Sequence, residues 1–324
     1  MYTLAEDSKV QPTSSHTYTA NFPAHWCIGN VPHGGYVTSC FQQVASSHFA
    51  TTLSKQNSPH TMTMHVSFLR RTEVGPAIFT VKDTKLGLRT STIHITLTQQ
   101  NREEVVAYIT NTNFSTETGV SFPTNFELSP PAPKVVIKRL EQDEDTNWAE
   151  SHLQPFLEFR KAVQHVRFYF PRLGQPHPSV LDQWMRFASG ELFTNKTLGY
   201  VVDMFPQILE TYRFDGKDPF AADVSRRPNK EDVAKAKKAG EARGPSWYPT
   251  VLLNLDVKKD LGEGVEWLFV RCRTKAIRGG RFDLEVLVYD VGGELVAISN
   301  HVALAVDASR NLAKRKEGDE GSKL

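Results

Sequence analysis

Asp203 is the residue of this sequence best suited to chemistry, because it lies inside an apolar run. It follows Gly199-Tyr200-Val201-Val202 and precedes Met204-Phe205. A carboxylate in such surroundings must be hydrogen-bonded or paired, and the loss of hydration raises its pKa. A carboxyl group of this kind can act as a general base toward a bound water molecule. The alternative is that Asp203 is the N-cap of a helix, a common position for aspartate.

Motifs for other chemistries are missing from the sequence. It contains no Gly-x-Ser-x-Gly, no His-Glu-x-x-His, no Cys-x-x-Cys and no Gly-x-x-x-x-Gly-Lys. These patterns are typical of serine hydrolases, metal sites and phosphate-binding loops. The three cysteines Cys27, Cys40 and Cys272 are an odd number without metal-ligand spacing, as expected of reduced thiols. We therefore expect neither a metal nor a cofactor.

The elements that must position Asp203 begin with a helix and a sheet in the first half of the chain. His33-Gly34-Gly35-Tyr36 precedes a stretch of helical periodicity from Val37 to Phe49. Paired glycines at a helix start let another backbone or a ligand come close, and the free N–H groups there can hold an oxyanion. From Thr61 onward the apolar residues alternate with polar ones, which predicts antiparallel strands.

The second half of the chain repeats the first. Val105-Val106-Ala107 and Leu295-Val296-Ala297 match at an offset of 295 − 105 = 190 in the numbering, and Arg89 and Arg278 match at 278 − 89 = 189. Two further pairs match in the same order, Gly35-Tyr36-Val37 with Gly199-Tyr200-Val201 and Thr61–Val66 with Thr250–Leu255. Similar order and spacing together predict an internal duplication of a helix-plus-sheet unit.

Composition along the chain sets the predicted domain boundaries. We expect an N-terminal unit at 1–125 and a Pro-rich, acidic linker at 126–155. A C-terminal unit at 156–308 contains a charged insertion near 213–246, which is either a lid over Asp203 or a surface loop. The polar tail 309–324 is expected to be disordered.

The composition and the last residues bear on partners and location. The balance of 38 Lys+Arg and 36 Asp+Glu gives a net charge of +2, which argues against nucleic-acid binding. No apolar run is long enough to span a membrane. The sequence ends with Ser322-Lys323-Leu324, a tripeptide that peroxisomal import receptors read at a free carboxyl terminus. We therefore expect the protein in the peroxisome.

The duplicated unit resembles the double hotdog fold of the acyl-CoA thioesterase II family, an α+β fold with two tandem helices wrapped by curved antiparallel sheets. The resemblance covers roughly residues 15 to 307 and no single motif is diagnostic. It depends on three segments and one residue: His33-Gly34-Gly35-Tyr36, Leu198–Asp203, Thr250 and Gly293–His301. Relatives with this fold commonly associate through their sheets, so a homodimer is expected.

The resemblance also implies a catalytic site. The family holds a nucleophilic water with an Asp, a Thr or Ser, and a Gln, and forms no acyl-enzyme. Asp203 and Thr250 match the first two, whereas His301 replaces the Gln and alters the expected pH dependence. A threonine in a strand is often only a strand former, and a lone histidine is often a core residue. Predicted substrate-binding residues are His33, Gly34, Gly35, Tyr36 and, at a basic rim for the phosphates of coenzyme A, Arg278.

Three functions are consistent with this resemblance. The first is hydrolysis of a fatty or polyketide-like acyl-CoA by water held at Asp203, Thr250 and His301. The second is an enoyl-CoA hydratase or dehydratase, because some hotdog proteins use an Asp–His pair for that reaction. The third is a non-catalytic acyl-binding protein, for which the change from Gln to His at residue 301 is the main indication.

Overall fold

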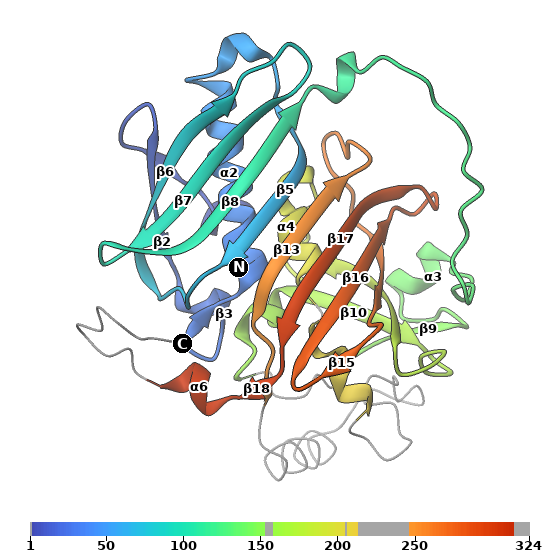
Figure 1. Cartoon of the computed structure of the whole chain (residues 1–324). Coiled ribbons are helices and arrows are strands. Elements are labelled where there is room, and N and C mark those ends of the chain that lie inside the picture. Colours follow the sequence, from blue (N-terminus) through green and yellow to red (C-terminus); the bar gives the residue numbers. More distant parts are fainter. Residues whose placement is uncertain (1, 153–157, 205, 213–245, 314–324) are drawn as a thin grey trace.

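The structure is a computed structural model that describes residues 2–152, 158–204, 206–212 and 246–313. Almost all of the predicted insertion near 213–246 and the terminal Ser322-Lys323-Leu324 lie outside the described residues. Two units, each a helix and an antiparallel sheet, lie side by side and share one continuous sheet (Figure 1). The predicted α+β double hotdog is confirmed. Within the described ranges, no helix combines the length and apolar character that crossing a bilayer requires.

The N-terminal unit is built around one long helix. Its elements are α1 (Leu4–Asp7), β1 (Gln11–Pro12), β2 (Thr17–Phe22), β3 (Cys27–Ile28), β4 (Val31–Pro32), α2 (Gly34–Ala50), β5 (His60–Phe68), β6 (Gly75–Lys85), β7 (Ser91–Gln99) and β8 (Arg102–Thr112). Buried and half-buried residues alternate along the whole of β7, as the period-two pattern predicts. The buried side of the sheet packs on α2, whose Val37, Phe41 and Val44 are fully buried.

The C-terminal unit contains the shorter of the two central helices. Its elements are α3 (Ile137–Glu141), β9 (Trp148–Glu150), β10 (Val166–Pro171), β11 (Val180–Phe187), α4 (Leu198–Val202), β12 (Ser246–Trp247), β13 (Thr250–Val257), β14 (Leu268–Arg273), β15 (Ile277–Arg278), β16 (Arg281–Tyr289), β17 (Leu295–Leu304), β18 (Val306–Asp307) and α6 (Ser309–Leu312). A 3-10 helix spans Pro206–Tyr212.

The strand order shows how the duplication is arranged. The main sheet runs β1-β2-β6-β7-β8-β5-β13-β17-β16-β14-β11-β10-β9, so equivalent strands are placed symmetrically about the β5–β13 pair. β7 and β16 have the same length, and their first positions differ in number by 281 − 91 = 190, as the repeat predicts. At the junction His65 pairs with Asn254, and His65 Nδ1 lies 2.6 Å from Asn254 Oδ1.

The structure excludes the alternative that Asp203 is a helix N-cap. Asp203 is the C-terminal cap of α4, a helix of five residues. Pro206 follows shortly afterwards, and proline in a helix interior removes a backbone hydrogen bond and clashes with the preceding turn. The second central helix is therefore much shorter than α2, and Asp203 lies at its end.

The predicted linker and tail contain more structure than expected. β9 joins the main sheet, and Leu140 and Trp148 are fully buried, so α3 and β9, which lie within the predicted linker, belong to the C-terminal unit. The tail begins with α6, where Asn311 is buried and its side-chain amide donates to the carbonyl of Ile28 at 2.8 Å. These specific contacts order two segments whose composition alone indicates a loop.

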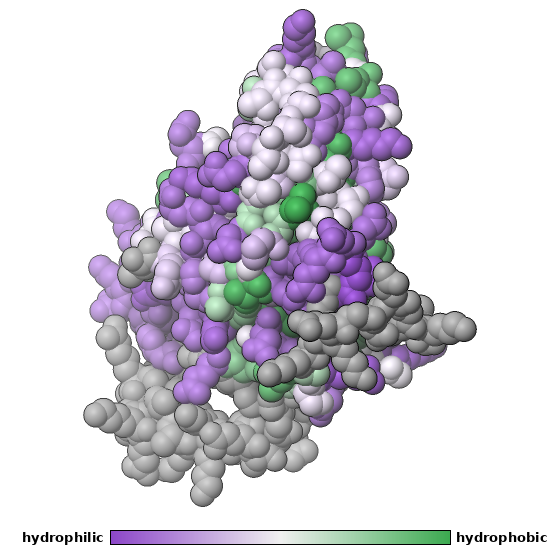
Figure 2. All heavy atoms as spheres, turned by 90° about the vertical axis from the view of Figure 1, so that its left-hand side faces the viewer, coloured by the Kyte–Doolittle hydropathy of each residue, from purple (hydrophilic) through white to green (hydrophobic). Residues whose placement is uncertain are grey.

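The side of the molecule on which β2 and β6 lie is mainly polar, with isolated apolar residues (Figure 2).

Candidate active site

Asp203 and Thr250 form a buried hydrogen-bonded pair between α4 and β13. The Thr250 hydroxyl donates to Oδ1 of Asp203 at 2.7 Å, and only 4% of the Asp203 surface is exposed. Burial raises the pKa of Asp203 to about 7, although hydrogen bonds from Thr250 and from the backbone N–H of Gly35 act in the opposite direction. Asp203 is thus a carboxyl group that changes its protonation near neutral pH, as a general base requires.

His301, on β17, presents a lone pair to Asp203. The Ser299 hydroxyl donates to the Asn254 carbonyl at 2.5 Å, so it accepts from Nε2 of His301 at 2.8 Å. This assigns the ring proton to Nε2 and leaves Nδ1 unprotonated, 3.6 Å from Oδ1 of Asp203. Within the described residues, Nδ1 has no hydrogen-bond partner. Burial lowers the pKa of His301 to about 3, so the ring is neutral at working pH.

His33 presents the opposite polarity to the same carboxyl group. It is the N-cap of α2, where its Nδ1 accepts from the backbone N–H groups of Gly35 at 3.1 Å and Tyr36 at 3.4 Å. The proton therefore lies on Nε2, which is 3.9 Å from Oδ2 of Asp203. Burial, together with the charge of Arg160, lowers the pKa of His33 to about 3. A neutral N–H donor from the N-terminal unit thus faces the Asp203 carboxyl group of the C-terminal unit.

The paired glycines allow α2 to approach Asp203. A Cβ atom on Gly34 would lie 2.6 Å from Oδ2 of Asp203, and one on Gly35 would lie 2.8 Å from the Cα of Tyr200. The overlap at Gly35 is with backbone atoms, so this position requires glycine, whereas at Gly34 the end of the Asp203 side chain would have to move. The prediction that the pair permits close approach of another backbone is confirmed by this packing.

Two polar side chains of α2 hold α4, and their signal in the sequence is weak. The side chain of Gln42 accepts from the Gly199 N–H at 2.9 Å and donates to the Asn195 carbonyl at 2.8 Å. Ser39 accepts from the Tyr200 N–H at 3.2 Å. These contacts satisfy N–H groups that a helix start leaves without intrahelical partners. α2 also contains Gln43, Ser46 and Ser47, so a Gln and a Ser in this helix do not stand out in the sequence.

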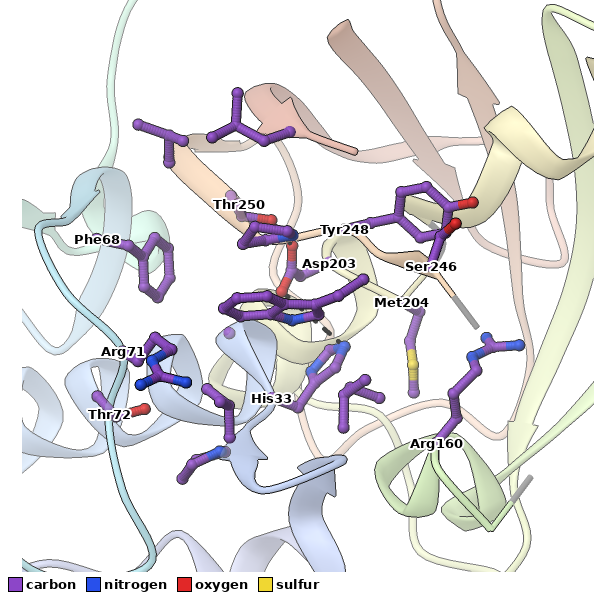
Figure 3. A pocket seen from close by; sticks show the side chains of 18 of the residues that line it. His33, Phe68, Arg71, Thr72, Arg160, Asp203, Met204, Ser246, Tyr248 and Thr250 are labelled. Atoms are coloured by element: carbon purple, nitrogen blue, oxygen red, sulfur yellow. Dashed lines mark hydrogen bonds and ion pairs between the residues drawn. The ribbon is translucent and has the colours of Figure 1, made fainter. Parts of the chain in front are cut away.

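A cavity of about 430 Å³ opens onto the carboxyl group. His33, Gly34, Asp203 and Thr250 are among its lining residues. Figure 3 shows Phe68, Arg71 and Thr72 on one side of Asp203, with Met204, Tyr248 and Arg160 on the other. Apolar side chains make up much of the wall, including Ile28, Val31, Val163 and Trp247. An apolar space with a few converging polar groups is typical of a small-molecule site.

The structure does not bring every predicted site residue to this cavity. His301 lies beside Oδ1 of Asp203, at 3.6 Å, and is not among the described residues that line the cavity. The side chain of Tyr36 points elsewhere, since its hydroxyl donates to the Asp7 carbonyl at 2.7 Å. Gly35 packs on Tyr200 and also lies outside the lining. Arg278 is an exposed residue of β15 and does not line the cavity, because the β15–β16 hairpin extends into solvent.

Two family models match the chain, one for each unit. The acyl-CoA thioesterase N-terminal domain matches residues 22–112, and the acyl-CoA thioesterase C-terminal domain matches residues 137–305. The chain belongs to the acyl-CoA thioesterase family. It is therefore a thioester hydrolase, as the resemblance of its sequence predicted.

The chain is also similar to individual thioesterases. The thioesterase is 38% identical to the thioesterase-like protein TwmA of Talaromyces wortmannii, over 98% of this chain and 96% of that protein. Among solved structures it is similar to a putative thioesterase II of Thermobifida fusca, with a TM-score of 0.67 and 17% identity over 94% of this chain and 98% of that one. It also resembles the acyl-CoA thioesterase II TesB2 of Mycobacterium marinum, with a TM-score of 0.61 and 15% identity over 94% and 97% of the chains.

Proposed function

We propose that this thioesterase hydrolyses an acyl-CoA with a water molecule activated by Asp203. The observation that carries the proposal is the buried Asp203–Thr250 pair in the wall of an apolar cavity. Thr250 occupies Oδ1, so the water is assigned to Oδ2, which faces Gly34. Asp203 takes one proton from this water while the water oxygen adds to the carbonyl carbon of the thioester. The C–S bond then breaks, and the coenzyme A thiolate leaves and takes up a proton, giving the free acid and the thiol.

The carbonyl oxygen becomes negatively charged during this addition and needs a hydrogen-bond donor. The start of α2 is the best candidate, because Gly34 lines the cavity beside Oδ2 of Asp203. His301 is assigned to Asp203 rather than to the water. Its Nδ1 lone pair faces Oδ1 of Asp203 and repels the negative charge of the carboxylate. This favours the protonated form of Asp203, which makes Asp203 a stronger base.

The proposed substrate is a fatty or polyketide-like acyl thioester of coenzyme A. The acyl chain fits the apolar part of the cavity, and Arg70 and Arg71 line it where phosphates could bind. Arg70 also donates to the Glu103 carbonyl at 2.7 Å, and Arg71 to the Asn311 carbonyl at 3.2 Å. Lys258 and Lys259 do not line the cavity and pair with Asp256 and Asp290, each at 2.5 Å. The relative TwmA carries the name thioesterase-like, which supports the reaction class and leaves the acyl group to experiment.

Hydration of an enoyl-CoA by an Asp–His pair is the second candidate, and the hydrogen bonds of His33 argue against it. A histidine that removes a proton from carbon needs an unprotonated nitrogen facing the substrate. The two backbone N–H groups of α2 occupy Nδ1 of His33, so Nε2 carries the proton. His33 is therefore a donor at this site, which suits polarisation or orientation better than proton abstraction.

The reaction is tested by release of free thiol from a panel of acyl-CoA esters of different chain length and polarity. Asp203→Asn keeps the size of the side chain and removes the base, and we expect turnover to fall about 10²- to 10⁴-fold. Asp256→Asn is the matched control, since Asp256 pairs with Lys258 on the surface and should leave turnover unchanged. Unaltered turnover in Asp203→Asn would remove Asp203 from the mechanism. Tight acyl-CoA binding without thiol release would favour an acyl-binding protein instead.

We also propose import into the peroxisome through Ser322-Lys323-Leu324, together with a homodimer in solution. The tripeptide supports the first proposal, and the fold of the family supports the second. A fluorescent protein fused to the N-terminus should colocalise with peroxisomes, and deletion of the three residues should make the fluorescence diffuse. Light scattering during size-exclusion chromatography gives the number of chains per particle. Diffuse fluorescence of the intact fusion, or a monomeric mass, would contradict the respective proposal.

A further inference from the structure

Two histidines and an aspartate converge near the C-terminal end of α2, away from the candidate active site. His48 belongs to α2, Asp83 belongs to β6, and His16 directly precedes β2. Nε2 of His48 lies 2.9 Å from Oδ1 of Asp83, and Nε2 of His16 lies 3.3 Å from Oδ2 of the same residue. One nitrogen of each ring and one carboxylate oxygen all lie within 4.8 Å of one another.

The second nitrogen of each ring is held by a hydroxyl group. Nδ1 of His48 lies 3.1 Å from the hydroxyl of Tyr18, and Nδ1 of His16 lies 2.9 Å from the hydroxyl of Ser15. In metal sites the non-ligating nitrogen of a histidine is usually hydrogen-bonded in this way, which fixes the ring orientation. Both rings are thus oriented with Nε2 toward Asp83 before any ion binds.

The separation of the two rings fits tetrahedral coordination. With Zn–N bonds of about 2.0–2.1 Å, two imidazole centroids at a tetrahedral angle are about 5.2 Å apart. The centroids of His16 and His48 are 5.0 Å apart, and the ring planes are inclined by 67°. Little movement of either ring is needed to bring the two Nε2 atoms to one ion.

The charges around this cluster favour a cation. The ion pairs of Asp83 within the described residues are both with histidines, so no lysine or arginine there neutralises its carboxylate. His48 lies in the last turn of α2, where the helix dipole contributes negative potential. A second cluster, Asp143, Glu150 and His152, is different, because the guanidinium group of Arg167 already binds Glu150 at 2.7 Å.

We propose that His16, His48 and Asp83 form a binding site for one divalent transition-metal ion, with Zn²⁺ as the best match to two imidazoles and a carboxylate. His48 is fully buried, while His16 and Asp83 are partly exposed, so the ion enters from their side and water completes the coordination. His48 and Gly34 lie near opposite ends of α2, about 21 Å apart along its axis. The ion joins α2 to β6 and to the residue before β2, so it stabilises the N-terminal unit. At this distance from Gly34 it takes no part in thioester hydrolysis.

Metal binding is measured on full-length protein without a histidine tag, after treatment with a chelator. Equilibrium dialysis against Zn²⁺ with elemental analysis should give one ion per chain, and Co²⁺ should give the intense visible absorption of tetrahedral coordination. His16→Ala and Asp83→Asn should each weaken Zn²⁺ binding at least tenfold. His152→Ala is the matched control and should bind like wild type. Zn²⁺ should raise the Tm of wild type and of His152→Ala, and should leave the Tm of His16→Ala and Asp83→Asn unchanged.

Two results would overturn the proposal. The first is the absence of stoichiometric binding to wild type at micromolar Zn²⁺. The second is equal Zn²⁺ affinity of wild type and His16→Ala, because this residue lies before a strand at a partly exposed position and its loss should leave the fold intact. Either result would leave the cluster as a hydrogen-bonded His–Asp–His group. The readouts are independent of turnover, so they test the site whatever the substrate proves to be.

Discussion

Nδ1 of His301 lies 3.6 Å from Oδ1 of Asp203 and is directed there by Ser299, two positions earlier on the same strand. A lone pair facing a carboxylate favours the protonated carboxyl group, which can donate to it. A glutamine, the residue expected at this position from the family, can instead donate an N–H to the carboxylate. With His in place of Gln, the carboxylate form of Asp203 therefore faces a lone pair where the family has an N–H donor.

The first prediction concerns Thr250 and the pH dependence of turnover. Asp203 acts as a base only when deprotonated, so kcat/KM should rise with pH through its pKa of about 7 and then level off. The hydrogen bond from Thr250 lowers this pKa. Thr250→Val removes the bond at nearly constant volume, so the rise should move to higher pH. Steady-state kinetics between pH 5 and 9 measures the shift, and Thr250→Ser is the control that keeps the hydroxyl. An unshifted profile in Thr250→Val would contradict the assignment.

The second prediction concerns Ser299 as a positioning residue for His301. Ser299→Ala removes the acceptor of the Nε2 proton, which leaves a buried N–H unsatisfied at a cost of about 1–3 kcal/mol. We expect the ring proton to move to Nδ1, where it can donate to Asp203. The rise of kcat/KM with pH should then move to lower pH, because the carboxylate form gains a donor.

Nitrogen chemical shifts of the His301 ring report the tautomer directly, and this measurement separates a positioning role from loss of stability. Ser299→Thr retains a hydroxyl and should keep the wild-type tautomer and pH profile. If Ser299→Ala retains both as well, Ser299 does not orient the ring.

The third prediction concerns the glycine at the start of α2. The Cβ of Gly34→Ala would lie 2.6 Å from Oδ2 of Asp203, the oxygen assigned to the catalytic water. We expect a loss of turnover of at least about 10²-fold with little change in Tm, because the displaced atom ends a side chain. Gly264→Ala serves as a control for stability alone, since Gly264 has a φ of +113°, its Cβ would meet Leu192 at 2.8 Å, and neither residue lines the cavity. Wild-type turnover in Gly34→Ala would exclude Oδ2 as the water site.

Much of the fold could be predicted from the sequence, because each unit has a strong periodic signal. The alternation of Ile93, Ile95 and Leu97 specifies a strand, and the matching order and spacing of the two halves specify a duplication. Segments whose order depends on distant partners were missed. Trp148 and Asn311 lie in stretches that are polar or rich in proline, and only their burial against other elements orders them.

The candidate site was predictable in its residue types and less so in its geometry. Asp203 was identified because a carboxylate in an apolar run needs a partner, and Thr250 is that partner. The ring orientations of His33 and His301 depend on backbone N–H groups and on Ser299, which no spacing in the sequence specifies. The His16–His48–Asp83 cluster draws on three separate segments of the sequence, which come together only in the fold.

The last prediction concerns Gln42, which connects the two central helices and touches no substrate. Its amide oxygen accepts from the Gly199 N–H, while its amide nitrogen donates to the Asn195 carbonyl. Gln42→Leu fills the same space and leaves both backbone groups buried without partners, which should lower the free energy of unfolding by about 1–3 kcal/mol for each group. Since α4 ends at Asp203, the loss should also lower kcat more than it changes KM.

Gln42→Glu separates the two contacts, because a carboxylate still accepts from Gly199 but repels the Asn195 carbonyl. We expect it to fall between wild type and Gln42→Leu in both Tm and kcat. Gln43→Leu, at the neighbouring position of α2, changes a half-buried side chain with one hydrogen bond of 3.5 Å to Ser8 and should have little effect on either. Equal kcat values for wild type and Gln42→Leu at a temperature where both are folded would show that α4 holds Asp203 without help from α2.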